Sequence, residues 1–405
     1  MKPHNSNFAV VTLNKPVLWT RNVSPEGDES WALLPNRKYV LCANQLGNLE
    51  QHIDSISDIK HTSLYKPFSL ANFRHNDTIL IERTRERGIG DMLFMTGPMS
   101  FLQFISGGKC KMDTFALADR GAVLNNHPAL RYGAPFYGPL RYEDLAIYDQ
   151  HLLIDTVTEY TDDTAQPNVY DAIYATMGID PTTVPSAYKR PSITLTNDDL
   201  KDVDQFFYYT WAEKKVDLRQ TGYYVIAPSA RGSLRVAPYA TWLKVIDELS
   251  KRRPVVVVGD ASERMPAPDM TYGEFVSRIP TSNNVVNAIG RTPIRVLMSL
   301  VQRATAVGCL DSGVLYIAQA LRVPAVSIWG PHDPKTRIGY DADYMANAVW
   351  NKEVCRHSPC YAFAKFPVDK CPMESSQTVC HPLLTVAPEA IISKFITIEE
   401  QNGKA

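Results

Sequence analysis

Short apolar runs alternate with longer apolar segments through most of the chain. Residues 304–310 form one such run, a polar turn follows, and residues 314–321 have the composition of a buried helix. A second apolar run covers residues 323–329. Strands of parallel sheets are buried on both faces and are joined by helices, so this stretch predicts one β-α-β unit.

The same alternation recurs in two blocks and predicts an α/β protein with two lobes and a linker between them. Expected strands lie at 78–84, 112–117, 146–154, 222–228 and 254–260, with a further short strand ending at 287–290. Expected helices lie at 92–102, 169–177, 198–215, 238–249, 293–301 and 388–395. The first 77 residues differ, because the β-prone runs 8–13 and 38–42 flank the turn-rich residues 22–29.

The expected domains follow from these blocks. They are a β-rich appendage at 1–77, a first lobe at 78–200, a second lobe at 221–385, and a C-terminal helix and tail at 386–405. The Pro-bearing residues 180–220 have the composition of a linker. The helix starting near Pro293 is expected to take Thr292 as its cap.

Composition narrows the class of protein. The chain has 405 residues, of which 45% are hydrophobic and 21% charged, with a formal net charge of -1. These are the values of a soluble globular protein, without a global charge that draws it to nucleic acid or membrane. No apolar run approaches the 18 residues of a membrane span, and the N-terminus has no apolar signal core, so we expect a cytoplasmic protein.

Polar residues at strand ends are the first candidate site. Asp311, Ser312 and Gly313 follow the strand at 304–310, and ligands of open α/β sheets bind at the carboxyl ends of strands. Backbone donors at the next helix N-terminus suit a phosphate, and Asp311 suits a hydroxyl or a ribose. The alternative is that Asp311 or Ser312 only caps the helix.

A second strand-to-helix turn, at 229–235, carries Ser229, Arg231 and Arg235. Guanidinium groups match phosphate oxygens in geometry and charge, so these residues predict an anion site. The alternative is an exposed basic loop.

The first lobe has a third such turn. Gly88 and Gly90 allow close backbone approach to a ligand, and Asp91 falls in the first turn of the helix. A carboxylate there can take a proton from a hydroxyl, or can simply favour the helix dipole. Three arginines precede the turn and are candidates for binding acceptor or phosphate: Arg83, Arg85 and Arg87.

The cysteines are a fourth feature. Their number, seven, is odd, which argues against a complete disulfide framework. Four of them cluster near the C-terminus in spacings that match no standard zinc finger: Cys355, Cys360, Cys371 and Cys380. They are candidates for structural zinc or, equally, free thiols of a reducing compartment.

Together these motifs resemble glycosyltransferase family 9, the ADP-heptose:lipopolysaccharide heptosyltransferases. Five blocks carry the resemblance, in the family's order: 88–93 with 96–98; Arg235 with Pro238 and Trp242; 257–260 with 263–264; 311–313 with 318–324; and 329–334. The cysteine-bearing tail is similar as well. The family usually has histidine where this chain has Tyr316, and its members usually lack the 77 additional N-terminal residues.

The resemblance implies a GT-B fold and an inverting transfer without a metal or other cofactor, from a nucleotide diphosphate sugar to an acceptor hydroxyl. It implies Asp91 as general base, with Asp311 and Glu263 on hydroxyls of the donor. Ser229, Arg231, Arg235 and the backbone at Ser312 and Gly313 would meet the leaving diphosphate.

The acceptor stays open between alternatives. The resemblance favours a lipopolysaccharide core or another surface glycan. A second interpretation is a phage-type enzyme that glycosylates hydroxymethylated bases of DNA, for which the arginines beside Asp91 would bind phosphate. The near-neutral net charge counts against DNA. A nucleotide-sugar-binding protein without transfer activity and a GT-B epimerase are further alternatives.

Overall fold

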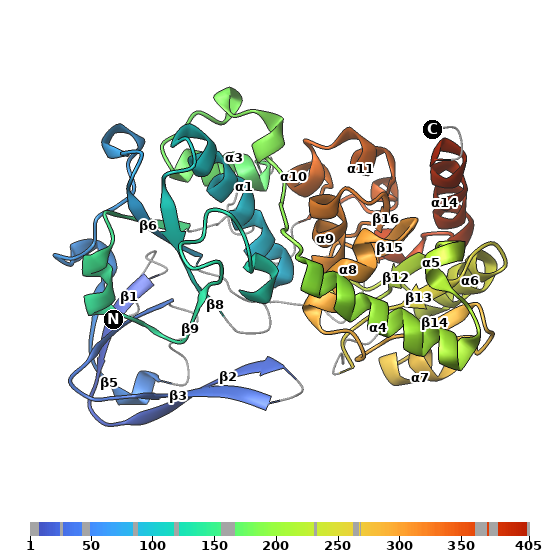
Figure 1. Cartoon of the computed structure of the whole chain (residues 1–405), viewed down its shortest axis with the longest axis horizontal. Coiled ribbons are helices and arrows are strands. Elements are labelled where there is room, and N and C mark those ends of the chain that lie inside the picture. Colours follow the sequence, from blue (N-terminus) through green and yellow to red (C-terminus); the bar gives the residue numbers. More distant parts are fainter. Residues whose placement is uncertain are drawn as a thin grey trace. The chain divides into compact units, whose positions relative to one another are not determined.

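The computed structural model describes residues 8–24, 27–42, 49–83, 88–116, 121–154, 167–230, 233–261, 267, 269–360, 371 and 380–402. The chain forms two compact units (Figure 1). Unit 1 comprises Met1–Thr156 and Val169–Lys189, and unit 2 comprises Val157–Asn168 and Arg190–Ala405.

Unit 2 is built on a six-stranded parallel sheet in the order β14-β13-β12-β15-β16-β17. Its strands are β12 (Tyr224–Ala227), β13 (Val255–Val257), β14 (Val285–Asn287), β15 (Ala306–Leu310), β16 (Ala325–Ile328) and β17 (Ala348–Val349). From β12, the next two strands in sequence, β13 and β14, are added on one side of the sheet. The strands β15, β16 and β17 are then added on the other side. This is the strand order of nucleotide-binding Rossmann folds, whose ligand crevice lies where the order reverses. In unit 2 that point is between β12 and β15.

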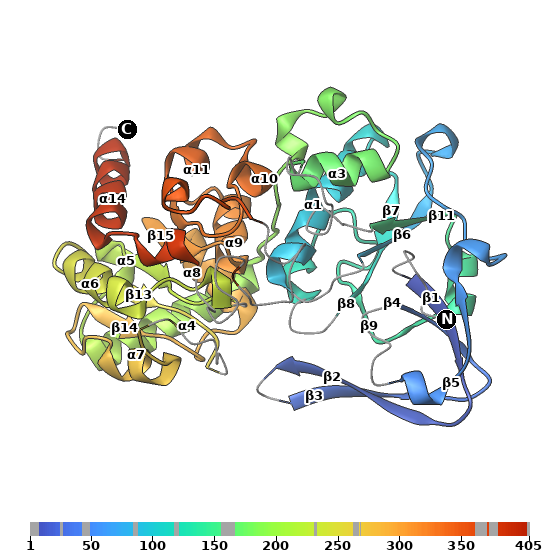
Figure 2. The ribbon, with the colours of Figure 1, turned by 180° about the vertical axis from the view of Figure 1, so that it is seen from behind.

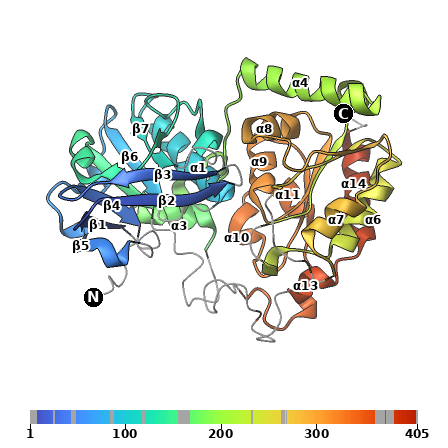
Figure 3. The same ribbon diagram turned by 90° about the horizontal axis from the view of Figure 1, so that it is seen from below.

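Helices cover both faces of this sheet (Figure 3). One layer packs α6 (Tyr239–Ser250) against α7 (Tyr272–Arg278) and α14 (Pro388–Asn402). The other packs α8 (Ile294–Gln302) against α4 (Asn197–Lys214) and α9 (Gly313–Leu321). The fully buried Trp242 and Phe395 lie in the core between the first layer and the sheet. Shorter helices are α5 (Leu218–Thr221), α10 (Lys335–Ile338), α11 (Ala342–Ala346) and α13 (His381–Leu384).

Unit 1 has a smaller parallel sheet, in the order β11-β6-β7. Its strands are β6 (Thr78–Arg83), β7 (Lys111–Asp113) and β11 (Gln150–Ile154), and its helices are α1 (Ile89–Ile105) and α3 (Val169–Thr176). The strand β8 (Phe115–Ala116) pairs with β9 (Phe136–Tyr137). Phe94 and Phe101 of α1 meet Tyr170 and Tyr174 of α3 edge to face, which joins the two helices.

The N-terminal β-rich segment packs on this α/β part (Figure 2). A four-stranded sheet in the order β10-β4-β1-β5 contains β1 (Phe8–Leu13), β4 (Lys38–Cys42), β5 (Ile53–Asp58) and β10 (Leu140–Arg141). Alternate residues of β1 face opposite sides: Phe8 and Val10 share a cluster with Leu80 of β6, whereas Ala9 and Val11 pack with Leu33. One face of the appendage is therefore fixed to the parallel sheet. The strands β2 (Val17–Ser24) and β3 (Gly27–Leu33) form a separate hairpin.

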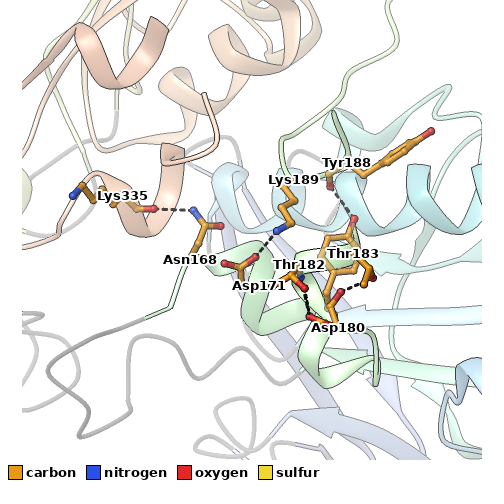
Figure 4. Close-up of polar contacts among 9 residues, drawn as sticks. Asn168, Asp171, Asp180, Thr182, Thr183, Tyr188, Lys189 and Lys335 are labelled. Carbon is orange, nitrogen blue, oxygen red and sulfur yellow. Dashed lines mark hydrogen bonds and ion pairs between the residues drawn. The ribbon is translucent and has the colours of Figure 1, made fainter. Parts of the chain in front are cut away.

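The chain crosses between the units after residues 156, 168 and 189, and polar contacts fasten it beside two crossings (Figure 4). In unit 2 the Asn168 side-chain amide donates to the backbone oxygen of Lys335 at 2.8 Å. In unit 1 the buried ammonium of Lys189 lies 2.9 Å from a carboxylate oxygen of Asp171. The chain is thus anchored at Asn168 within unit 2 and at Lys189 within unit 1.

The predicted α/β pattern is confirmed, with local differences. Turn-rich residues 22–29 lie mostly in β2 and β3, because the hairpin ladder pairs Arg21 with Glu29. The supposed linker contains α4, whose Asp199 pairs with Arg295 of α8 inside unit 2. Pro293, not Thr292, is the N-cap of α8, and no side chain caps that helix.

Candidate active site

Three neighbouring strands of unit 2 end at the point where the strand order reverses. Ser229 follows β12, Asp311 follows β15, and His332 lies four residues beyond β16. Because these strands are parallel and adjacent, their carboxyl ends meet at one edge of the sheet. The structure therefore brings Ser229 and Asp311, which the sequence singled out, together with His332, which it did not.

Asp311 is the centre of a buried hydrogen-bonded cluster. The hydroxyl of Tyr316 donates to its Oδ1 at 2.5 Å, and Nδ1 of His332 lies 2.9 Å from its Oδ2. The exposed fractions of Asp311, Tyr316 and His332 are only 4%, 4% and 2%. Both carboxylate oxygens that were assigned to a donor hydroxyl thus engage protein side chains. Asp311 is also not a helix cap, because its carboxylate contacts side chains instead of helical amides.

Two arginines place positive charge on this cluster. Arg235 donates from Nη1 to the backbone oxygen of Asp311 at 3.3 Å, and Arg337 of α10 is 4% exposed. Burial alone would raise the pKa of Asp311, but the hydrogen bond from His332 and the charges of His332, Arg235 and Arg337 lower that pKa well below its usual range. Burial and the charge of Asp311 raise the pKa of the Tyr316 hydroxyl well above its usual value. Asp311 is therefore a carboxylate and Tyr316 a neutral donor.

Ser312 and Gly313 stand at the start of α9. Ser312 is the N-cap by backbone geometry, yet its hydroxyl makes no capping hydrogen bond. Its Oγ is buried without a hydrogen-bond partner among the residues that the structure describes. The capping alternative for the Ser312 side chain therefore finds no support, and the hydroxyl remains available with the backbone amides of the first helical turn.

The remaining predicted donor residues of unit 2 lie around β12 and β13. Gly259, just past β13, lies close to Tyr272 and Ser229: an added Cβ would meet the Tyr272 hydroxyl at 2.5 Å and would come within 3.5 Å, an ordinary contact, of the Ser229 Oγ. Arg231 and Glu263 lie outside the described residues.

In unit 1, Asp91 lies in the first turn of α1, and the N-cap of that helix is Gly88. The side chain of Asp91 is partly exposed. A Cβ on residue 88 would approach Oδ2 of Asp91 to 2.9 Å, so glycine is needed there for this carboxylate position. Gly90 lies in the same turn and is partly exposed. Arg83 is the last residue of β6, and its side chain is outside the part of the structure that is described. Arg85 and Arg87 lie wholly outside the described residues.

The four C-terminal cysteines meet around one small pocket beside the donor cluster. Cys355, Cys360, Cys371 and Cys380 line it with Leu234, Pro331 and His381. The six cysteines whose side chains the structure describes form no disulfide with one another. Among the described residues, no three His, Cys, Asp or Glu side chains are arranged to hold a metal ion.

Sequence reasoning missed His332, Arg337 and the hydrogen bond of Tyr316. One signal for His332 was present, since it belongs to a polar turn directly after the apolar strand at 323–329. Arg337 gave no signal, because a single arginine in a charged segment reads as a surface residue.

A family model described as glycosyltransferase family 9 (heptosyltransferase) matches residues 145–362, which is more than half of the chain. The chain belongs to glycosyltransferase family 9. It is therefore an enzyme of the nucleotide-sugar glycosyltransferase class. The matched range includes the Asp311 cluster and lies beyond Asp91. A search of curated proteins gave no match.

Solved structures show the GT-B fold of this glycosyltransferase. ADP-heptose lipopolysaccharide heptosyltransferase II of E. coli matches with a TM-score of 0.57 and 15% identity, covering 80% of this chain and 99% of its own. A family 9 glycosyltransferase of Veillonella parvula matches with a TM-score of 0.56 and 12% identity, covering 82% of this chain and 99% of its own. TibC, an iron-containing dodecameric glycosyltransferase of enterotoxigenic E. coli, matches with a TM-score of 0.56 and 15% identity, covering 98% of this chain and 94% of its own. The match to TibC thus extends over more of this chain than the other two. None of the described helices is long and apolar enough to cross a membrane.

Proposed function

We propose that this glycosyltransferase performs an inverting, metal-independent transfer of a sugar from a nucleotide diphosphate sugar to an acceptor hydroxyl, with Asp91 as general base. The observation that carries the proposal is the position of Asp91. Its carboxylate is partly exposed in the first turn of α1, just beyond the carboxyl end of β6. A base there can take the acceptor proton while the hydroxyl attacks the anomeric carbon.

The donor contributes a diphosphate leaving group, whose charge grows as the glycosidic bond breaks. Arg235, Ser229 and the amides at Ser312 and Gly313 are the groups of unit 2 that suit this charge, because preorganised donors stabilise charge where it develops. ADP-D-β-D-heptose is the first donor to test, since TibC was solved with that compound.

A metal is not required for this chemistry. TibC is described as iron-containing, and thiolates are ligands of iron. The four cysteines of the pocket are the thiols of this chain nearest to such a role, yet the described residues hold no metal-binding arrangement. The steps proposed here use only side chains and backbone amides of this chain.

The acceptor that this proposal favours is a lipopolysaccharide core or another surface glycan. Support comes from the family and from the similarity to a lipopolysaccharide heptosyltransferase. A DNA acceptor would depend on Arg83, Arg85 and Arg87, whose side chains lie outside the described residues, and the near-neutral net charge counts against it.

Asp91→Asn tests the proposal because the amide keeps the shape of the carboxylate and cannot accept the proton. With ADP-D-β-D-heptose and a core oligosaccharide, we expect transfer to fall by about 10²- to 10⁴-fold, the range of general base catalysis, while donor affinity stays unchanged. Asp54→Asn, at an exposed carboxylate of β5, is the matched control.

Equal turnover by Asp91→Asn and the unmutated protein would remove Asp91 from the role. Hydroxymethylated duplex DNA in place of the oligosaccharide tests the other acceptor class. Conversion of the sugar without any acceptor would indicate an epimerase, and donor binding without conversion would indicate a binding protein.

A further inference from the structure

Each carboxylate oxygen of Asp311 already accepts from a buried side chain of the protein. Tyr316 occupies Oδ1 and Nδ1 of His332 occupies Oδ2, inside a cluster from which water is nearly excluded. A hydroxyl of the donor would have to share an oxygen with one of these partners. The geometry indicates that Asp311 acts within the protein.

His332 contacts the carboxylate of Asp311 at 2.9 Å, Arg235 contacts its backbone oxygen at 3.3 Å, and the charge of the buried Arg337 also acts on it. Two of them are permanent cations, and the third becomes a cation when it takes a second proton. One carboxylate therefore faces an excess of positive charge, at the strand edge where a ligand is expected. A ligand with two or more negative charges suits such a cluster, whereas a neutral sugar does not.

We propose that His332 and Arg337 bind the diphosphate of the sugar donor together with Arg235, and that Asp311 and Tyr316 position His332 for this contact. This inference rests on the proposed function and adds two ligands to its donor site. Asp311 then changes from a substrate ligand to a positioning residue.

The hydrogen bond to Asp311 sets the protonation pattern of His332. Because a carboxylate only accepts hydrogen bonds, the proton of the neutral imidazole sits on Nδ1. When the diphosphate arrives, its negative charge favours a second proton, taken from solvent onto Nε2, which then donates to a phosphate oxygen. Donor binding thus takes up a proton.

The other titratable groups around His332 keep one state in the range where an imidazole changes charge. Asp311 stays ionised and Tyr316 stays protonated, for the reasons given above. Burial raises the pKa of the nearby Cys309 thiol, so that it also remains protonated. Arg235 and Arg337 stay charged. Within this cluster, Nε2 of His332 is the position where donor binding is expected to add a proton.

Calorimetric titration with ADP-D-β-D-heptose in two buffers of different ionisation enthalpy measures this uptake without an acceptor or turnover. Both phosphates of this donor are diesters with fixed charge, so the ligand itself takes no proton. For the unmutated protein we expect uptake of a fraction of a proton near pH 7 and tighter binding at pH 6 than at pH 8. This measurement needs no variant and therefore does not depend on the folding of one.

His332→Gln should abolish the uptake and weaken binding about tenfold at pH 6, the loss of one charge-assisted hydrogen bond, with a much smaller loss at pH 8. Arg337→Met should weaken binding about tenfold at both pH values, because its charge does not titrate. His357→Gln, at an exposed histidine of the same unit, is the matched control and should change neither quantity.

The possible results distinguish failure of this inference from failure of the proposed transferase function. Absence of proton uptake by the unmutated protein, or unchanged binding by both variants, overturns the inference and leaves the transferase proposal intact. If the protein binds inorganic pyrophosphate but not ADP-D-β-D-heptose, the proposed donor is wrong; weaker pyrophosphate binding by both variants would then still support the inference. Binding of neither compound refutes both.

Discussion

The Asp311 cluster of unit 2 and two buried histidines of unit 1 hold titratable side chains in opposite ways. Unit 2 buries Asp311 as a charged group, surrounded by His332 and two arginines. Unit 1 buries His127 and His151 as neutral groups held by the backbone: Nδ1 of His127 accepts from the amide of Ala129 at 3.2 Å, and Nδ1 of His151 accepts from the amide of Lys66 at 2.8 Å. A nitrogen that accepts from an amide cannot also carry a proton.

This difference separates a site from a scaffold. A buried carboxylate among cations responds to any added charge, which is what a ligand-binding cluster requires. A neutral imidazole between backbone groups forms hydrogen bonds with the main chain, as His151 does with Nε2 3.0 Å from the oxygen of Leu145. Its charge changes mainly when the pH falls. The Asp311 cluster therefore points to function, whereas His127 and His151 point to stability.

Asp311→Asn should have the largest effect on this contrast. An amide cannot balance the buried cations, so the free energy of unfolding should fall by about 3–5 kcal/mol, the cost of breaking a buried charge pair by removing one partner. Asp343→Asn, at an exposed aspartate of unit 2, should stay within about 0.5 kcal/mol of the unmutated protein. Denaturant unfolding measures both. If Asp311→Asn unfolds at the unmutated midpoint, Asp311 is a dispensable substrate ligand after all.

How far the sequence could predict this contrast depends on the range of the interactions. The strand after residue 304 and the helix from Gly313 were predictable, because apolar periodicity is local. So was the position of Asp91 at a helix start. Local patterns carry these features whatever the rest of the chain does.

The partners of Asp311 were not predictable from local patterns. His332 is 21 residues away in sequence and meets Asp311 only because β15 and β16 are neighbours in the sheet. The sequence showed Tyr316 as a departure from the family, but not that its hydroxyl donates to Asp311. Side-chain contacts between elements depend on strand order and packing, which composition and spacing do not contain.

Acidification should weaken unit 1 before unit 2. Burial lowers the pKa of His127 to about 4, although a backbone hydrogen bond at Thr96 opposes the shift. His127 therefore takes up a proton near pH 6.5 in the unfolded chain but only near pH 4 in the folded unit. Its contribution to the free energy of unfolding is fully present above pH 6.5 and is lost as the pH falls toward 4. The loss should be about 2 kcal/mol at pH 5 and about 3 kcal/mol at pH 4. Burial also lowers the pKa of His151, which acts in the same direction.

Hydrogen exchange read by peptide at pH 7 and pH 5 checks this order. After correction for intrinsic rates, peptides of α1 should lose protection at pH 5, because His127 contacts Ser100 of that helix at 3.4 Å, while β15 peptides should keep theirs. Replacing His127 by Gln should flatten the pH response, and replacing the exposed His75 by Gln should not. Equal loss in both units would show that the histidines do not set the acid limit.

The smallest effect comes from single hydroxyl groups, and it tests the same contrast. Tyr316→Phe removes a hydrogen bond to a charged acceptor and should cost about 2 kcal/mol, whereas Tyr174→Phe in unit 1 removes one to the neutral backbone oxygen of Tyr188 and should cost about 1 kcal/mol. Combining Tyr316→Phe with Asp311→Asn decides the mechanism, because contacting residues are not additive. If Tyr316 acts through Asp311, Tyr316→Phe should lower the free energy of unfolding by about 1 kcal/mol less in the protein that already carries Asp311→Asn than in the unmutated protein. An unchanged cost would mean that Tyr316 stabilises unit 2 by packing alone.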